Sequence, residues 1–164
     1  MTDADLTAAL EQLGVEAADP RAVLLLPLVE IAWADGAVQE PERLRILELA
    51  RGYGVVGGRS EDTVRRWLST RPSPAVAQLG REVVVALTQR HRGPGADWST
   101  DVLDRVEEQC LDVAQAAGGL FGLVFSTSAE ERAAITAIRE ALRAGRARYD
   151  DDLPDPEGGQ FEDV

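Results

Sequence analysis

The stretch DPRAVLLLPLVEIAW, residues 19–33, decides the fold that we expect. Asp19 can cap a helix, and Pro20 suits the first helical position. The residues that follow are apolar on nearly every side of a helix, which predicts a central, buried helix. Pro27 lies inside the stretch and lacks the amide hydrogen that would bond back one turn. The helix should therefore kink or split near Pro27.

The same helical periodicity extends over most of the chain, and no segment shows the alternation of a half-buried strand. We therefore expect an all-α fold, a single bundle of about seven helices. Proline, glycine and capping residues mark where these helices begin and end. The expected helices cover about 2–13, 19–33, 40–53, a segment capped by Ser60 and ending before Pro72, a segment opened by Ser73 and Pro74 and ending before Gly93, 100–117, and 129–144.

Composition narrows the classes of function. The chain has 164 residues, of which 45% are hydrophobic and 28% charged, as in an ordinary soluble domain. Its 17 basic and 29 acidic residues give a net charge of -12, which opposes binding to nucleic acids. All the basic residues are arginine, which excludes mechanisms that need a lysine, such as Schiff-base chemistry.

Cysteine usage and hydropathy indicate the compartment. Cys110 is the only cysteine, so no disulfide can form within the chain, as suits a reducing cytoplasm. Residues 1–13 lack the basic start of a secretory signal. The longest apolar block, residues 22–34, is interrupted by Pro27 and Glu30 and is shorter than the roughly 20 residues of a membrane span. We expect a cytoplasmic protein without a transmembrane segment.

The last residues differ in composition from the rest of the chain. Residues 150–164 contain seven acids, two prolines, two glycines and no basic residue. Such a segment cannot bury enough apolar area to offset the entropy lost on ordering. We expect one helical domain over residues 1–149 and a disordered acidic tail over residues 150–164.

One motif carries a family resemblance. Residues 25–42 read LLPLVEIAWADGAVQEPE, in which an apolar helix ends at Ala34–Gly36 and Glu42 opens the next helix. This arrangement resembles the signature of TerB-like domains, small helical domains related to tellurite resistance proteins. The same module precedes the J-domain of a membrane-anchored DnaJ-type co-chaperone, but this chain has no His-Pro-Asp tripeptide. The resemblance implies a module for protein interaction or metal sensing in a bacterial response to tellurite or metal stress.

A weaker echo of the motif lies in the last third of the chain. Residues 111–119 match residues 28–36 in character, and residues 128–131 match residues 39–42. The echo has Gly118 where the first copy has an aspartate, and six more residues precede its glutamate. We expect two pseudo-repeated helical hairpins related by an approximate two-fold axis.

The resemblance also implies a cation site. Asp35 and Glu42 would supply carboxylate oxygens to a divalent cation, the pseudo-repeat would bring Glu131 beside Glu42, and Glu40 could add a further ligand. Capping is the alternative: Asp35 satisfies amides of its turn, and Glu42 reaches back to the start of its helix. Both interpretations stay open at this point. We expect no other cofactor.

The remaining reactive residues favour a protein that is not an enzyme. Cys110 lies on the apolar stripe of its helix, His91 sits beside arginines at a helix end, and Ser126 has no histidine nearby in sequence. The alternatives are a structural adaptor or oligomer subunit without metal and, with less support, a metal-dependent hydrolase that uses Asp35 and Glu42.

Two segments bear on partners, of which we expect at least one to be a protein. Residues 118–125 form an apolar loop that either tucks under the bundle or meets a partner helix or membrane surface. The acidic tail either keeps the protein soluble or binds a basic partner. Peripheral membrane contact and the oligomeric state stay open.

Overall fold

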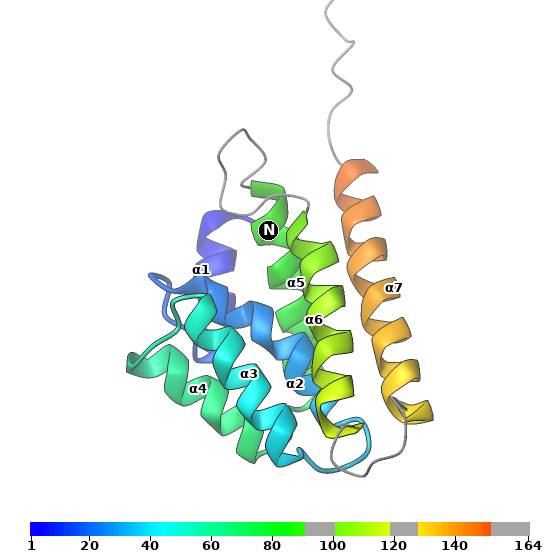
Figure 1. Ribbon diagram of the computed structural model, residues 1–164. Coiled ribbons are helices and arrows are strands. Elements are labelled where there is room, and N and C mark those ends of the chain that lie inside the picture. Colours follow the sequence, from blue (N-terminus) through cyan, green and yellow to red (C-terminus); the bar gives the residue numbers. More distant parts are fainter. Residues whose placement is uncertain (91–100, 119–127, 152–164) are drawn as a thin grey trace, which may run out of the picture.

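The computed structural model of the chain describes residues 1–90, 101–118 and 128–151 (Figure 1). Within these ranges the chain forms seven α-helices and one 3-10 helix, packed into a single bundle, and no strand. The expected all-α fold is confirmed. In chain order the elements are α1 (Asp3–Leu13), η1 (Pro20–Leu25), α2 (Leu26–Ala32), α3 (Glu40–Gly52), α4 (Gly58–Ser69), α5 (Pro74–Arg90), α6 (Asp101–Gly118) and α7 (Ala129–Asp151).

The expected split near Pro27 is confirmed. The chain enters as a 3-10 helix after Asp19, and α2 begins at Leu26, so Pro27 lies in the first turn of α2. In that turn backbone amides have no partner inside the helix, so the missing amide of a proline costs nothing. The apolar segment therefore becomes two short helical pieces.

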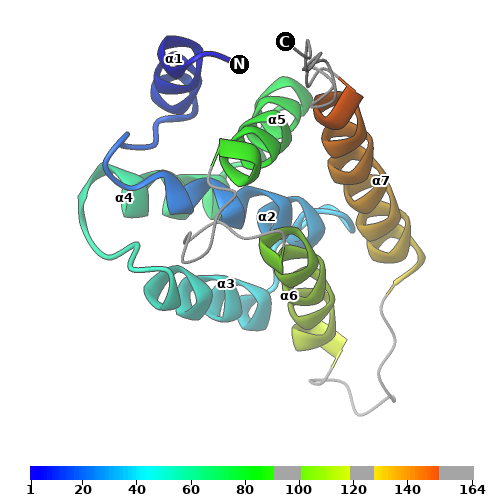
Figure 2. The ribbon, with the colours of Figure 1, turned by 90° about the horizontal axis from the view of Figure 1, so that it is seen from above.

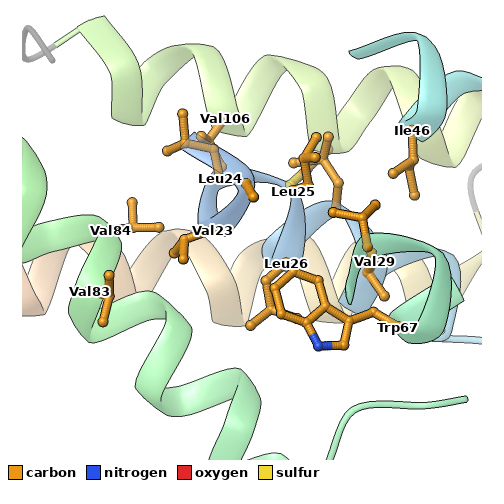
Figure 3. Packing of buried hydrophobic residues seen from close by; sticks show 14 of the residues in the cluster. Val23, Leu24, Leu25, Leu26, Val29, Ile46, Trp67, Val83, Val84 and Val106 are labelled. Atoms are coloured by element: carbon orange, nitrogen blue, oxygen red, sulfur yellow. The ribbon is translucent and has the colours of Figure 1, made fainter. Parts of the chain in front are cut away.

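These two pieces form the centre of the molecule. The side chains of Val23, Leu25, Leu28 and Ile31 are completely buried. α2 contacts α3, α4, α5, α6 and α7, while α1 packs on η1 and α5 (Figure 2). Figure 3 shows valines of α5, Val106 of α6, Ile46 of α3 and Trp67 of α4 around this segment. The other helices thus form a shell around η1 and α2.

Polar contacts tie the shell together. The indole Nε1 of Trp33 donates to the carbonyl oxygen of Trp67 at 2.9 Å, which joins the end of α2 to α4. The hydroxyl of Tyr53 donates to Oε1 of Gln109 at 2.5 Å, between the end of α3 and α6. Burial raises the pKa of Tyr53, so this hydroxyl keeps its proton. The first bond fixes the end of α2, which the candidate site follows, and the second fixes the far end of α3.

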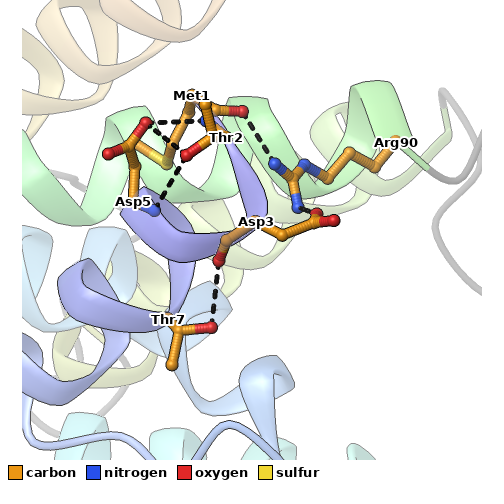
Figure 4. Close-up of polar contacts among 6 residues, drawn as sticks. All are labelled: Met1, Thr2, Asp3, Asp5, Thr7 and Arg90. Atoms are coloured by element: carbon orange, nitrogen blue, oxygen red, sulfur yellow. Dashed lines mark hydrogen bonds and ion pairs between the residues drawn. The ribbon is translucent and has the colours of Figure 1, made fainter.

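The start of α1 is anchored to α5 (Figure 4). Thr2 and Asp5 form a capping box, in which the backbone amide of Thr2 donates to Asp5 at 2.8 Å. Arg90 at the end of α5 donates to the carbonyl oxygen of Met1 at 2.7 Å and pairs with Asp3. The Thr2 bonds lower the pKa of Asp5.

Two expected boundaries are wrong. Ser60 does not cap α4, because that helix begins at Gly58 after Gly57, whose φ is +74°. Ser60 is instead fully buried, and its hydroxyl oxygen accepts from the amide of Glu16 at 3.1 Å. The last helix continues past Ala144 to Asp151, so residues 150 and 151 are helical. Residues 152–164 and the apolar loop after Gly118 lie outside the described residues.

Other boundaries agree with expectation. Ser73 precedes α5 and accepts from the amide of Val76 at 3.3 Å, as a helix cap does. None of the described helices has both the length and the apolar character needed to cross a membrane.

The close approach of α2 and α5 predicts an unusual response to alanine. A Cβ at Gly80 would lie 2.3 Å from Cδ2 of the buried Leu26, whereas a Cβ at Gly52 would meet nothing within 4 Å. We expect Gly80→Ala to lower the free energy of unfolding by about 1–3 kcal/mol, although alanine favours helices. Gly52→Ala should raise it by up to about 1 kcal/mol. Urea denaturation of both variants measures the difference, and equal effects would contradict the packing described here.

Candidate functional site

The turn between α2 and α3 is shaped by Asp35 and Gly36. Gly36 has a φ of +103°, a conformation that favours glycine, and its amide donates to the carbonyl oxygen of Trp33 at 3.0 Å. Asp35 is exposed, and its Oδ1 accepts from the amide of Ala37 at 3.2 Å. Asp35 therefore satisfies a turn amide, as its capping role predicts.

Glu42 lies in the first turn of α3 and is only 2% exposed. Its Oε2 accepts from the backbone amide of Gln39, the residue before the helix, at 2.6 Å. The side chain thus reaches back to the helix start, and its expected capping role is confirmed. The positive end of the α3 dipole also lies beside its carboxylate.

Glu131 occupies the equivalent position in α7 and is 6% exposed. Its Oε2 accepts from the amide of Ser128 at 2.5 Å, and Oγ of Ser128 accepts from the amide of Glu131 at 3.0 Å. This pair forms the expected capping box. Helices α3 and α7 therefore begin in the same way, each with a buried glutamate that closes its first turn.

The charge of Glu131 acts on Glu42. The pKa of Glu42 is raised to about 7, chiefly by burial; the hydrogen bond from Gln39 opposes this rise, and the charges of Glu131 and Asp35 add to it. No arginine in the described part of the chain forms an ion pair with Glu42 or Glu131. Within the described ranges, Glu42 and Glu131 are thus two buried like-charged groups without a basic partner, which we call the glutamate pair.

The structure brings together some of the expected cation ligands. Glu42 and Glu131 form the glutamate pair, and Asp35 lies at its edge, close enough for its charge to act on Glu42. Glu40 points elsewhere: its side chain is 71% exposed and its Oε2 lies 3.6 Å from Nε of Arg43. Among the described residues, no three His, Cys, Asp or Glu side chains are arranged to hold a metal ion. The ligand set within this part of the chain is therefore incomplete.

The hairpins agree with the expected pseudo-repeat at the level of packing. α2 contacts both α6 and α7, and α6 contacts both α2 and α3. A two-fold axis that exchanges the hairpin α2–α3 with the hairpin α6–α7 would produce this set of contacts. The axis itself stays a prediction.

The structure also contains a groove that the sequence did not reveal, whose lining includes Ala34 and Glu130 but none of the expected cation ligands. It has a volume of about 660 Å³ and lies between the end of α2, the start of α5 and the first half of α7. Glu30 and Arg81 form an ion pair in its wall, and burial raises the pKa of Glu30 against the influence of Arg81. The sequence feature that points to this groove is Glu30, a single acid in an otherwise apolar helix. In the sequence alone, Glu30 is visible only as an interruption of the apolar block.

Cys110 is a structural thiol, as expected. It is 1% exposed, and burial raises its pKa to about 12, so it carries no thiolate at neutral pH. His91 and Ser126 lie outside the described residues.

No protein-family model, curated protein or solved structure matches this chain. The likeness to TerB-like domains therefore rests on residues 25–42 and on their weaker echo.

The raised pKa of Glu42 predicts a pH dependence of stability. In the unfolded chain a glutamate loses its proton near its ordinary pKa of 4.5, whereas folded Glu42 keeps it up to about pH 7. The folded state therefore binds the proton more tightly, and Glu42 destabilises the fold progressively as the pH rises from about 4.5 to 7.

Glu42→Gln should remove this contribution, since glutamine can also close a capping box. Melting temperatures of the wild type and the variant, measured from pH 5 to pH 8 without divalent metal, should converge at the acidic end. At the alkaline end the variant should be the more stable. Glu40→Gln is the matched control in the same helical turn, and parallel curves for wild type and Glu42→Gln would refute the prediction.

Proposed function

We propose that this protein is a non-enzymatic helical module that responds to a divalent cation through Glu42 and Glu131. The observation that carries the proposal is that both carboxylates are buried and that the charge of Glu131 acts on Glu42, while no arginine of the described residues forms an ion pair with either. Two ionised carboxylates in a low-dielectric site repel each other, so a proton or a cation has to compensate them.

The geometry of the caps supports a cation. Each glutamate uses Oε2 for the amide at its helix start, so the cap does not occupy Oε1 of either side chain. Asp35 lies at the exposed edge of the pair and can reach a hydrated ion. Mg²⁺ keeps several of its waters and needs only one or two carboxylates, whereas Ca²⁺ takes six to eight oxygens. A small, hydrated cation therefore suits this site best.

The proposed cellular role follows from the resemblance to TerB-like domains. That resemblance implies a part in a bacterial response to tellurite or other metal stress, with a protein partner. A binding role agrees with the buried, protonated thiol of Cys110 and with the absence of lysine from the chain. A hydrolase that uses Asp35 and Glu42 has less support, because Glu42 is almost completely buried.

A structural adaptor or oligomer subunit without metal is the second candidate. The pKa of about 7 for Glu42 favours it, since a proton on this group would relieve the repulsion from Glu131 at neutral pH. In that case the glutamate pair closes two helix starts and has no ligand. The cation-responsive module and the adaptor differ in whether a cation compensates the negative charges of Glu42 and Glu131 at alkaline pH.

Thermal melting at pH 8, where Glu42 is ionised, distinguishes them. Millimolar Mg²⁺ or Mn²⁺ should raise the melting temperature of the wild type by several degrees relative to chelator, because a ligand of the native state alone stabilises it by mass action. Glu42→Gln and Glu131→Gln should abolish the shift, and Asp35→Asn should reduce it.

Glu40→Gln is the control, since its side chain pairs with Arg43 away from the site and the shift should persist. Isothermal titration of the wild type provides the direct measurement of binding. No heat and no shift with any of Mg²⁺, Mn²⁺, Ca²⁺ or Zn²⁺ would leave the adaptor as the function.

A further inference from the structure

Helix α7 is held on the bundle by a narrow apolar stripe. Its large buried apolar side chains are Ile135, Ile138 and Leu142, at helical spacing. α7 packs on α5, α2 and α6 and forms one edge of the molecule (Figure 1). It therefore covers the core from one side, whereas α2 is enclosed by its neighbours.

The packing beneath α7 is incomplete on both of its flanks. A cavity of about 60 Å³ lies between α6 and α7, lined by Cys110 and by the stripe Ile135, Ile138 and Leu142. On the other flank runs the groove of about 660 Å³, whose wall includes Ala134 and Ile138. Side chains that border these two spaces pack against fewer protein atoms than side chains on an enclosed helix, so both spaces limit the apolar contact that holds α7.

Polar groups at the same interface are also unsatisfied. Among the described residues, the buried side-chain atoms without a hydrogen-bond partner are Nε of Arg139 and Oε1 of Glu30. Arg139 belongs to α7 and pairs through its terminal nitrogen with Glu107 of α6, and Glu30 lines the groove beside α7. An unpaired buried polar atom opposes folding of the segment that buries it.

The ion pairs between α7 and α6 lie in the middle of α7, where Arg139 and Arg143 both approach Glu107 of α6. These pairs hold α7 only at that point along its length.

We infer that α7 opens as a separate unit: it leaves α5 and α6 while the rest of the bundle stays folded. Local opening of this kind occurs where buried contacts are few. The opening rests on the packing of α7 and is independent of the proposed function. An opened α7 presents an amphipathic helix with apolar side chains at positions 135, 138 and 142, the spacing by which helices dock in grooves.

The rate at which a reagent labels the thiol of Cys110 can be used to measure this opening. Cys110 is the only thiol of the chain, it is buried, and it lines the cavity under α7. A thiol reagent added to the intact protein at pH 8 labels Cys110 only when the site opens. We expect labelling to be faster than global unfolding allows and to be insensitive to low urea concentrations, since a local opening exposes little surface.

A matched pair of leucine variants tests which helix opens. Leu142→Ala in α7 should speed labelling by about tenfold or more, because it removes part of the stripe that holds the helix. Leu68→Ala in α4 removes an equally buried leucine away from α7 and should leave labelling without urea unchanged. Equal acceleration in both variants would overturn the inference.

Because a smaller side chain could also widen the path for the reagent, amide hydrogen exchange of the wild type provides an independent measurement. Amides of α7 should exchange faster than those of α2 and α5. Uniform protection across these three helices would equally overturn the separate opening of α7.

Discussion

Residues 20–32 have to be covered by protein on every side, and the rest of the structure depends on this constraint. η1 and α2 are too short to be stable alone, since isolated helices of this length do not persist in water. Their stability comes from burial, and each of the other α-helices contacts η1 or α2. Pro27 adds to the constraint, because the break at Leu26 divides the apolar segment into two pieces that are each shorter than one continuous helix would be.

The glutamate pair arises from this arrangement at two levels. Locally, Glu42 and Glu131 close the first turns of α3 and α7, which is an ordinary role for glutamate at that position. Globally, packing around α2 brings the two helix starts near each other, so two favourable caps create one unfavourable charge interaction. A protein that needed only the caps could use glutamine at either position, without the repulsion.

The sequence predicts most of what local chemistry determines. The break before Pro27, the cap at Ser73 and the capping box at Ser128 follow from backbone requirements that a few neighbouring residues express. Glu40 lies away from the glutamate pair because it is two residues from Glu42, and residues two apart on a helix point to different faces. The prediction that Ser60 caps a helix was wrong because the partner of its hydroxyl, the amide of Glu16, is distant in sequence.

The groove with Glu30 and Arg81 was not predicted, again because it depends on contacts between residues that are distant in sequence. Its walls come from three helices, and periodicity shows which face of a helix is apolar but not which helices meet. The approach of Glu131 to Glu42 was expected only through the internal echo, which compares two distant segments. Tertiary features of this chain were thus predictable where the sequence repeats itself and hidden where it does not.

The central position of α2 also has a consequence for synthesis of the chain. Residues 20–32 leave the ribosome before α6 and α7, two of the helices that cover them, have been translated. Until then a strongly apolar segment lacks part of its cover, and exposed segments of this kind aggregate or recruit chaperones. The nascent chain should therefore depend on such protection until α6 and α7 emerge and complete the core.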